Sequence, residues 1–191
     1  MFFKISICFL ITVLVFKVNA FVPDNLLESK RLSVCKQPNS YGFSQRAATN
    51  KHYLISDKSF DWMNAEFFCL NLGAHLPIPT NAEDTKFYRN FFTTGVKTLK
   101  FRNQSQFLDD SSLGTAGYWL GGYRSQANET WFWVDGSKFK YTEWIENEPN
   151  NMGKIENVAH DWFRVAEKKW LGWNDCPLWV YNHYTICELK C

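Results

Sequence analysis

The sequence predicts an α+β domain, with two helices in its first half and short strands and long loops in its second half. Between residues 57 and 91, apolar residues recur at steps of three and four, which is the period of an amphipathic helix. From residue 118 onward, short aromatic runs alternate with turn signals, and eight of the nine tryptophans lie in this part. Helices and strands in separate parts of a chain are typical of an α+β fold.

The first 20 residues have the layout of a secretory signal peptide. Lys4 precedes an apolar run over residues 5–16, and Val18-Asn19-Ala20 offers small residues for cleavage. A membrane anchor is the alternative, but Lys17 ends the run early, and a helical span needs about twenty apolar residues. No later segment is apolar enough to cross a bilayer. We therefore expect a secreted, extracellular protein without membrane insertion.

Residues 21–49 show no clear period, and we expect a loosely ordered lead-in to a folded domain over residues 50–191. Lys30-Arg31 in this lead-in is a candidate processing site. Residues 52–56 read as the first strand of the domain.

The first helix is expected to start at Asp57 or Ser59, either of which can cap it, and to end at Gly73. Its apolar face carries Trp62, Ala65, Phe68, Cys69 and Leu72. Thr80-x-x-Glu83 has the pattern of a capping box and opens a second helix. The inward-facing residues of that helix are Phe87, Tyr88 and Phe91.

The second half of the domain contains a predicted hairpin and a predicted closing strand. Alternating residues at 131–134, followed by Asp135-Gly136, indicate the hairpin. Residues 145–175 are rich in Asn, Glu and Trp without a sustained period, so we expect loops there. Residues 184–189 form the closing strand.

The cysteine count indicates disulfides and one leftover thiol. Cys8 is removed with the signal peptide, which leaves five cysteines in an oxidising compartment: Cys35, Cys69, Cys176, Cys187 and Cys191. The odd thiol is either free or paired with another chain, which would give a homo-oligomer. Two glycosylation sequons, at Asn103 and Asn128, agree with a secretory route.

Charge and motifs exclude several classes of function. Removal of Lys4 and Lys17 with the signal leaves 19 of the 21 basic residues, equal to the 19 acidic residues. Without a basic block, neither nucleic acid nor an anionic membrane is expected as the partner. The four histidines are scattered and no HExxH or GxSxG motif occurs, so we do not expect an enzyme. A glycosidase built on two carboxylates stays open, although Glu148 and Glu156 are better used as metal ligands.

Oxygen donors gather in the stretch before the closing strand. They are Glu148, Asn150, Glu156, Asn174 and Asp175. Calcium takes six to eight oxygen ligands, so three carboxylates and two amides suit it. Positions left open on the ion could accept sugar hydroxyls, to which amide NH₂ groups donate and from which carboxylates accept. A cis peptide at Pro149 would turn the side chains on either side of it to the same side. The alternative is that these side chains only hydrogen-bond a long loop.

Six ordered signatures over residues 50–190 resemble the C-type lectin domain family. They are Trp62-x-x-Ala65-x-x-x-Cys69, Tyr118-Trp119-Leu120-Gly121, Trp131-x-Trp133-x-Asp135-Gly136, Glu148-Pro149-Asn150, Trp173-Asn174-Asp175 and Ile186-Cys187-Glu188. The resemblance implies one calcium ion held by the five oxygen-donor residues, which also bind the sugar. The EPN motif implies ligands of the mannose, fucose and N-acetylglucosamine type, on glycoproteins or cell surfaces.

The chain departs from the family pattern at two places. Where relatives hold acids for further calcium ions, this chain has Arg124, Asn128, Asn151 and Asn157, so we expect a single ion. The family's second disulfide would join Cys176 to position 158, which is a valine here.

The resemblance implies a bridge between Cys69 and Cys187. Cys35 and Cys191 form a plausible second pair, because both ends of this fold lie together. Cys176 is then left over.

An extra stretch over residues 160–172 brings Trp162 and Trp170, with Trp179 nearby. These rings either widen a sugar-binding surface or pack the loop in place of the missing disulfide, and we favour packing. The rival function is a protein-binding module without sugar affinity. The complete ligand set favours the lectin.

Overall fold

The computed structural model describes residues 23–98, 115–179 and 181–191. The expected signal peptide at residues 1–20 and the sequon at Asn103 lie outside these ranges. No helix within them is long and apolar enough to cross a membrane.

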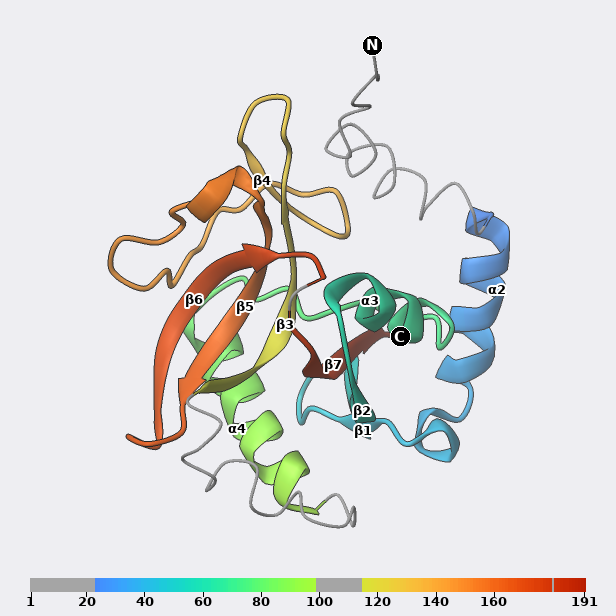
Figure 1. The fold of residues 1–191 in the computed structure, drawn as a ribbon. Coiled ribbons are helices and arrows are strands. Elements are labelled where there is room, and N and C mark those ends of the chain that lie inside the picture. Colours follow the sequence, from blue (N-terminus) through green and yellow to red (C-terminus); the bar gives the residue numbers. More distant parts are fainter. Residues whose placement is uncertain (1–22, 99–114, 180) are drawn as a thin grey trace.

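One seven-stranded sheet forms the centre of the fold (Figure 1), with its strands in the order β1-β2-β7-β3-β5-β6 and β4 paired to β3. All pairs are antiparallel except β3 with β7. The strands are β1 Ser44–Gln45, β2 Lys51–Phe60, β3 Thr115–Arg124, β4 Trp131–Trp133, β5 Glu156–Arg164, β6 Lys169–Pro177 and β7 His183–Lys190. The helices are α2 Asp24–Cys35, α3 Trp62–Leu70 and α4 Ala82–Thr98, with 3-10 turns η1 Pro38–Tyr41 and η3 Met152–Lys154. The predicted α+β class is confirmed.

Both helices of the first half start later than the sequence suggested. β2 continues to Phe60, and Asp61 caps α3 by accepting a hydrogen bond from the Asn64 backbone N–H at 2.8 Å. In α4 the cap is Asn81, whose Oδ1 accepts from the Asp84 N–H at 3.0 Å. The expected capping box of Thr80 and Glu83 is therefore wrong: the cap lies one residue later, and the N–H and hydroxyl of Thr80 both donate to the Asp84 carboxylate.

Two clusters of buried side chains form the core. One packs α4 on the sheet around Tyr88, Phe92 and Tyr118. The other packs α3 around Trp62 and Trp119, and each indole N–H of this pair donates to a backbone carbonyl at 2.7 Å. The indole N–H groups of Trp62 and Trp119 are thus both hydrogen-bonded, which removes the desolvation cost of an unpaired N–H at these two positions.

The stretch predicted as loops between residues 156 and 175 forms the β5–β6 hairpin instead. Asp161 in β5 is completely buried, and its carboxylate accepts from the Arg89 guanidinium at 2.8 and 3.0 Å and from the Tyr118 hydroxyl at 2.8 Å. Trp170 packs edge-on against Phe92 and Tyr118. The hairpin therefore adds to the core, and Trp170 serves packing, as favoured.

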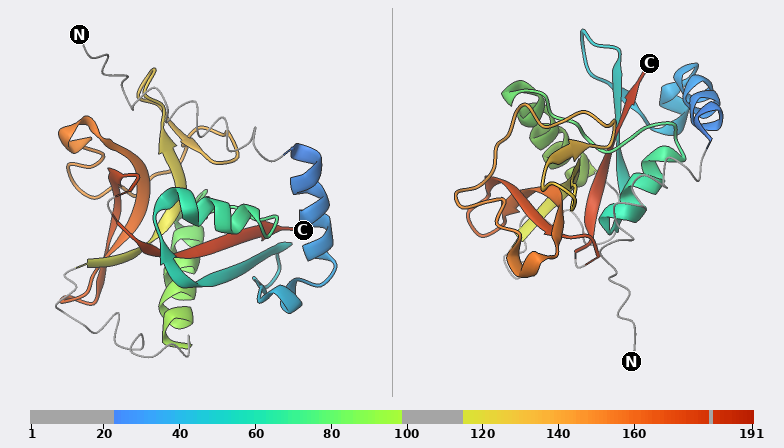
Figure 2. Two further views of the ribbon diagram at one scale, coloured as in Figure 1. Left: turned by 45° about the vertical axis from the view of Figure 1, so that its right-hand side comes forward. Right: turned by 90° about the horizontal axis from the view of Figure 1, so that it is seen from above.

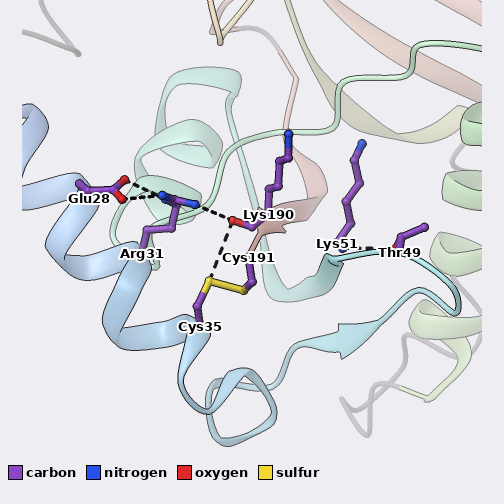
Figure 3. Close-up of a disulfide and its surroundings, with 7 residues drawn as sticks. All are labelled: Glu28, Arg31, Cys35, Thr49, Lys51, Lys190 and Cys191. Carbon is purple, nitrogen blue, oxygen red and sulfur yellow. Dashed lines mark hydrogen bonds and ion pairs between the residues drawn. A yellow bond between two sulfur atoms is a disulfide. The ribbon is translucent and has the colours of Figure 1, made fainter.

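Residues 24–35, expected to be loosely ordered, form helix α2, which lies beside the C-terminal end of the chain in both Figures 1 and 2. Arg31 donates to the Lys190 carbonyl at 2.9 Å (Figure 3) and pairs with Glu28 at 2.5 Å. Gly73 has a φ of +69°, and a Cβ there would lie 2.5 Å from the Arg31 Cα, so the helix docks against bare backbone. Lys30-Arg31 is thus held inside a packed helix, a poor substrate for a processing protease.

Two disulfides are present, in the pairs that the sequence suggested. Cys69–Cys187 lies in the core, joining α3 to β7, with both residues fully buried. Cys35–Cys191 joins the end of α2 to the chain after β7 (Figure 3), and this bridge is accessible at Cys191.

Candidate functional site

The loop before β5 carries Glu148 and Asn150 on either side of a cis peptide at Pro149. The two side chains turn to the same side, since the Asn150 Nδ2 donates to the Glu148 Oε1 at 2.8 Å. The Asn150 backbone N–H also donates to the Glu148 Oε2 at 3.1 Å. The acid and the amide of this tripeptide therefore act as one unit at the surface of the loop.

Asp175 in β6 joins this loop to the sheet. Its side chain is fully buried, and its two carboxylate oxygens each accept one backbone N–H, from Asn150 and from Asn151, at 3.0 Å. The Asn150 contact spans 25 residues of sequence. Charge-assisted hydrogen bonds of this kind are among the stronger ones in proteins, so Asp175 fixes the position of the loop.

Glu156 begins β5 on the other side of the loop and is 7% exposed. Its Oε2 accepts from the Met152 N–H at 2.7 Å, and the Asn150 Oδ1 accepts from the same N–H at 2.8 Å. Asn151, which has a φ of +50°, accepts from the Glu156 N–H at 3.3 Å through its Oδ1. The loop from residue 148 to residue 156 is thus closed on itself by polar contacts.

Asn174 precedes Asp175 in β6 and is held by a neighbour that the sequence did not indicate. The Asn174 Nδ2 contacts the His160 Nε2 at 3.1 Å and donates to the Asp175 carbonyl at 2.6 Å. This uses both amide hydrogens when the His160 Nε2 is the acceptor, and burial lowers the pKa of His160 well below its usual value, which favours that neutral form. The Asn174 Oδ1 accepts no hydrogen bond within the described part of the chain and is available as a ligand.

The three carboxylates carry negative charge without a matching ion pair. Burial and then Asp175 raise the pKa of Glu148 to about 7. Burial raises the pKa of Glu156 as well, and Asp175 contributes in the same direction. No lysine or arginine among the described residues forms an ion pair with any of these three groups. A cation in their midst would relieve this repulsion, so the donor set fits calcium.

The carboxylates do not make a metal site by themselves. In the described ranges, no three acidic, histidine or cysteine side chains lie close enough together to hold one ion. A calcium site here therefore also needs the amide oxygens of Asn150 and Asn174. Such a mixed set of carboxylates and amides is what a hard cation accepts.

Sequence reasoning missed His160, because residues 156–175 were expected to be loops. The signal that could have indicated a strand is the pair of apolar runs Val158-Ala159 and Trp162-Phe163. The polar residues at 160 and 161 between them obscured it, since both are buried and their side-chain partners lie far away in sequence.

Cys176 lies opposite Val158 in the β5–β6 ladder, the position at which the family bridge would need a second cysteine. Its thiol is the free one among the described cysteines and is 0% exposed. Burial of this thiol disfavours an interchain disulfide through Cys176 in the folded protein, and a homo-oligomer stays a prediction. Of the remaining extra rings, Trp162 is half-buried, and Trp179 is 55% exposed.

Comparison with known proteins agrees with this architecture. The family model of the Lectin C-type domain matches residues 58–189. A C-type lectin mannose-binding isoform from Notechis scutatus scutatus is 28% identical over 141 residues, covering 72% of this chain and 76% of the relative.

Two solved structures share the fold. The C-type lectin CEL-I from Cucumaria echinata has a TM-score of 0.58 at 20% identity, with 76% of this chain and 93% of that one covered. A calcium-independent type II antifreeze protein has a TM-score of 0.53 at 20% identity, with 77% and 90% covered. The family match spans more than half of the chain and includes every signature named above. This chain therefore belongs to the C-type lectin domain family.

Proposed function

We propose that this protein is a secreted lectin that binds sugars of the mannose, fucose or N-acetylglucosamine type through one calcium ion. The ion would be held by Glu148, Asn150, Glu156, Asn174 and Asp175. When bound, it would supply coordination for two neighbouring sugar hydroxyls. The same side chains would donate to and accept from those hydroxyls.

The observation that carries this proposal is the meeting of two distant segments. The Asn150 N–H lies 3.0 Å from the Asp175 carboxylate, so the EPN and WND motifs share one site. A loop that needed polar side chains only for its own hydrogen bonds would have no use for three carboxylates that lack a cationic partner. The raised pKa of Glu148 is the cost of that arrangement without an ion.

The choice of sugar rests on the order of acid and amide around Pro149. Exchange of the acid and the amide would reverse the placement of hydrogen-bond donors and acceptors around the ion. It would then favour the hydroxyl arrangement of galactose over that of mannose. A relative with 28% identity is described as mannose-binding, which supports the same assignment.

Secretion is supported by the two disulfides, which are typical of an oxidising compartment. Asn128, exposed in the loop between β3 and β4, is accessible for glycosylation.

Retention on mannose-agarose tests the proposal. The mature protein should bind the resin in the presence of calcium and elute with a chelator. A variant with both Glu148→Gln and Asn150→Asp should lose preference for mannose resin and gain it for galactose resin. Failure of the unaltered protein to bind mannose, fucose and galactose resins alike would contradict the proposal.

The second candidate is a protein-binding module. It is favoured by one observation, the shared fold with a calcium-independent antifreeze protein, since the fold persists there without calcium dependence. Calcium binding without any sugar retention would favour this candidate.

A further inference from the structure

Arg124 is the last residue of β3 and lies beside the start of β5. Its guanidinium is 9% exposed. The Nη2 donates to the Glu156 carbonyl at 3.0 Å and to the Asn157 Oδ1 at 3.1 Å. Arg124 thus holds the backbone of a candidate calcium ligand and the side chain of the residue after it.

The partners of Arg124 are unusual for a buried arginine. Buried charges are normally paired with an opposite charge, because desolvation is costly. Here the paired acid is Glu129, which is 77% exposed and 3.6 Å from the Nη1. The Arg124 Nε has no hydrogen-bond partner among the described residues. Solvent screening makes the Glu129 pair weak, so the Glu129 charge does not explain the burial.

The two close partners are a backbone carbonyl and an amide oxygen, which are ligand types that calcium accepts. The guanidinium therefore occupies a corner lined by oxygen donors. Burial raises the pKa of the Glu156 carboxylate, and the Met152 N–H and, to a smaller extent, the Arg124 guanidinium act against that rise.

We propose that Arg124 is a positioning residue for the calcium site, in which its guanidinium holds the Glu156 carbonyl and the Asn157 side chain. The proposal rests on the proposed function. These two hydrogen bonds fix the main chain at the start of β5, so that the Glu156 carboxylate stays turned toward the Met152 N–H of the loop. The loop is therefore ordered before any ion binds.

The alternative is that Arg124 only connects β3 to β5 and has no effect on calcium binding or on the order of the loop. The two roles differ in which measurement moves. A positioning residue changes calcium affinity and the order of the calcium-free loop.

The test uses Arg124→Met, with Glu129→Gln as the matched control that removes only the exposed ion pair. Calcium titration of the unaltered protein should give one site per chain. Arg124→Met should weaken the calcium Kd about tenfold, and Glu129→Gln by less than about twofold. In chelator, hydrogen exchange at the Met152 and Asn150 amides should speed up at least tenfold in Arg124→Met alone.

Two further variants cover the case in which Arg124→Met does not fold. Arg124→Lys keeps the charge but lacks the planar fork of the guanidinium. Its calcium Kd should therefore lie between the Kd of the unaltered protein and that of Arg124→Met. Asn157→Ala removes one of the two close partners and should weaken calcium binding in the same direction.

Unchanged calcium affinity and unchanged amide exchange in these variants would overturn the role of Arg124 while leaving the lectin proposal intact. Absence of calcium binding by the unaltered protein would overturn both.

Discussion

At the scale of single residues, the five proposed ligands differ in what they do for the fold. Asp175 is fully buried and accepts two loop amides, so it is part of the structure whether or not an ion is bound. Glu148 is half-buried on the loop surface, and both of its hydrogen bonds are to its neighbour Asn150. Binding and stability can therefore be separated by mutation.

We expect Glu148→Ala and Asp175→Ala each to abolish calcium-dependent retention on mannose resin, with different effects on stability. Asp175→Ala removes the acceptor of the Asn151 N–H and one of the two acceptors of the Asn150 N–H, and should lower the free energy of unfolding by about 1–3 kcal/mol in chelator. Glu148→Ala should lower it by less than about 0.5 kcal/mol. Urea denaturation in chelator measures both. Equal retention by the variants and the unaltered protein would refute the site assignment.

The charge on Glu148 predicts a pH dependence of calcium binding. Its pKa is raised to about 7 in the ion-free fold, so the group is partly protonated near neutral pH and must lose its proton to bind the ion. Calcium affinity should fall as the pH drops from 8 to about 6. The stability of the ion-free protein should depend on pH in the opposite direction. A raised carboxyl pKa lowers stability as the pH rises from about 4.5 to about 7, and calcium should remove that loss.

Calorimetric titration in two buffers of different ionisation enthalpy would detect the released proton. At about pH 6.5, calcium binding should release a fraction of a proton from Glu148. Glu148→Gln should abolish this release. Identical heats in both buffers for the unaltered protein would show that no proton leaves the site.

At the scale of elements, the sequence predicted those parts whose signals are local. The apolar face of α3, the hairpin turn at Asp135-Gly136 and the strand β7 are all where the pattern placed them. The helix starts were wrong by a few residues, because several polar residues in a row could each serve as a cap. Only pairing of β2 with β7 up to Phe60 decides that Asp61 is the one used.

Elements held by distant contacts were not predictable. Helix α2 buries only Val34, and its remaining support comes from the Cys35–Cys191 bridge, the Arg31 contact to Lys190 and the close approach to Gly73. None of these leaves a helical period in the sequence. Strand β5 was missed for a related reason, since the polar residue Asp161 looks exposed until Arg89 and Tyr118 are seen to surround it.

In the candidate site, too, residues with a local sequence signal could be predicted and residues that act through distant contacts could not. The five residues identified from the resemblance lie on one loop, at the start of β5 and in β6, but the resemblance did not indicate what orients them. His160 acts on Asn174 across the β5–β6 ladder, and Arg124 reaches Glu156 from β3. Contacts between strands depend on register, which a single sequence specifies poorly when the strands contain buried polar groups.

At the scale of the whole molecule, two disulfides tie the C-terminal end of the chain to both early helices. Cys69–Cys187 closes a loop with a sequence separation of 118, and Cys35–Cys191 one of 156. By chain entropy alone, each would stabilise the fold by about 5 kcal/mol, because the cost of closing a loop changes slowly with length. Any difference in the stabilisation that the two bridges supply must therefore come from the folded state.

We expect the core bridge to matter more than the outer one. Replacing Cys69 and Cys187 with alanine removes two sulfur atoms from a fully buried cluster and leaves a cavity in addition to the entropic loss. Replacing Cys35 and Cys191 frees α2, which can detach without opening the core, so part of the loss stays local. The first double variant should therefore show the lower urea midpoint, and the second should show fast hydrogen exchange over residues 24–35 with a largely preserved core.

Mild reduction provides an independent check on the unaltered protein. Cys191 is exposed, whereas Cys69 and Cys187 have no accessible surface, so a low concentration of reductant should open the outer bridge first. Mapping of alkylated cysteines by mass spectrometry would then find Cys35 and Cys191 labelled before any other. Because the candidate sugar site lies on the β5–β6 side of the sheet and α2 beside the C-terminal end (Figures 1 and 2), mannose retention should survive this step. Loss of retention together with release of α2 would instead mean that the outer bridge supports the whole domain, including the loop that carries Glu148.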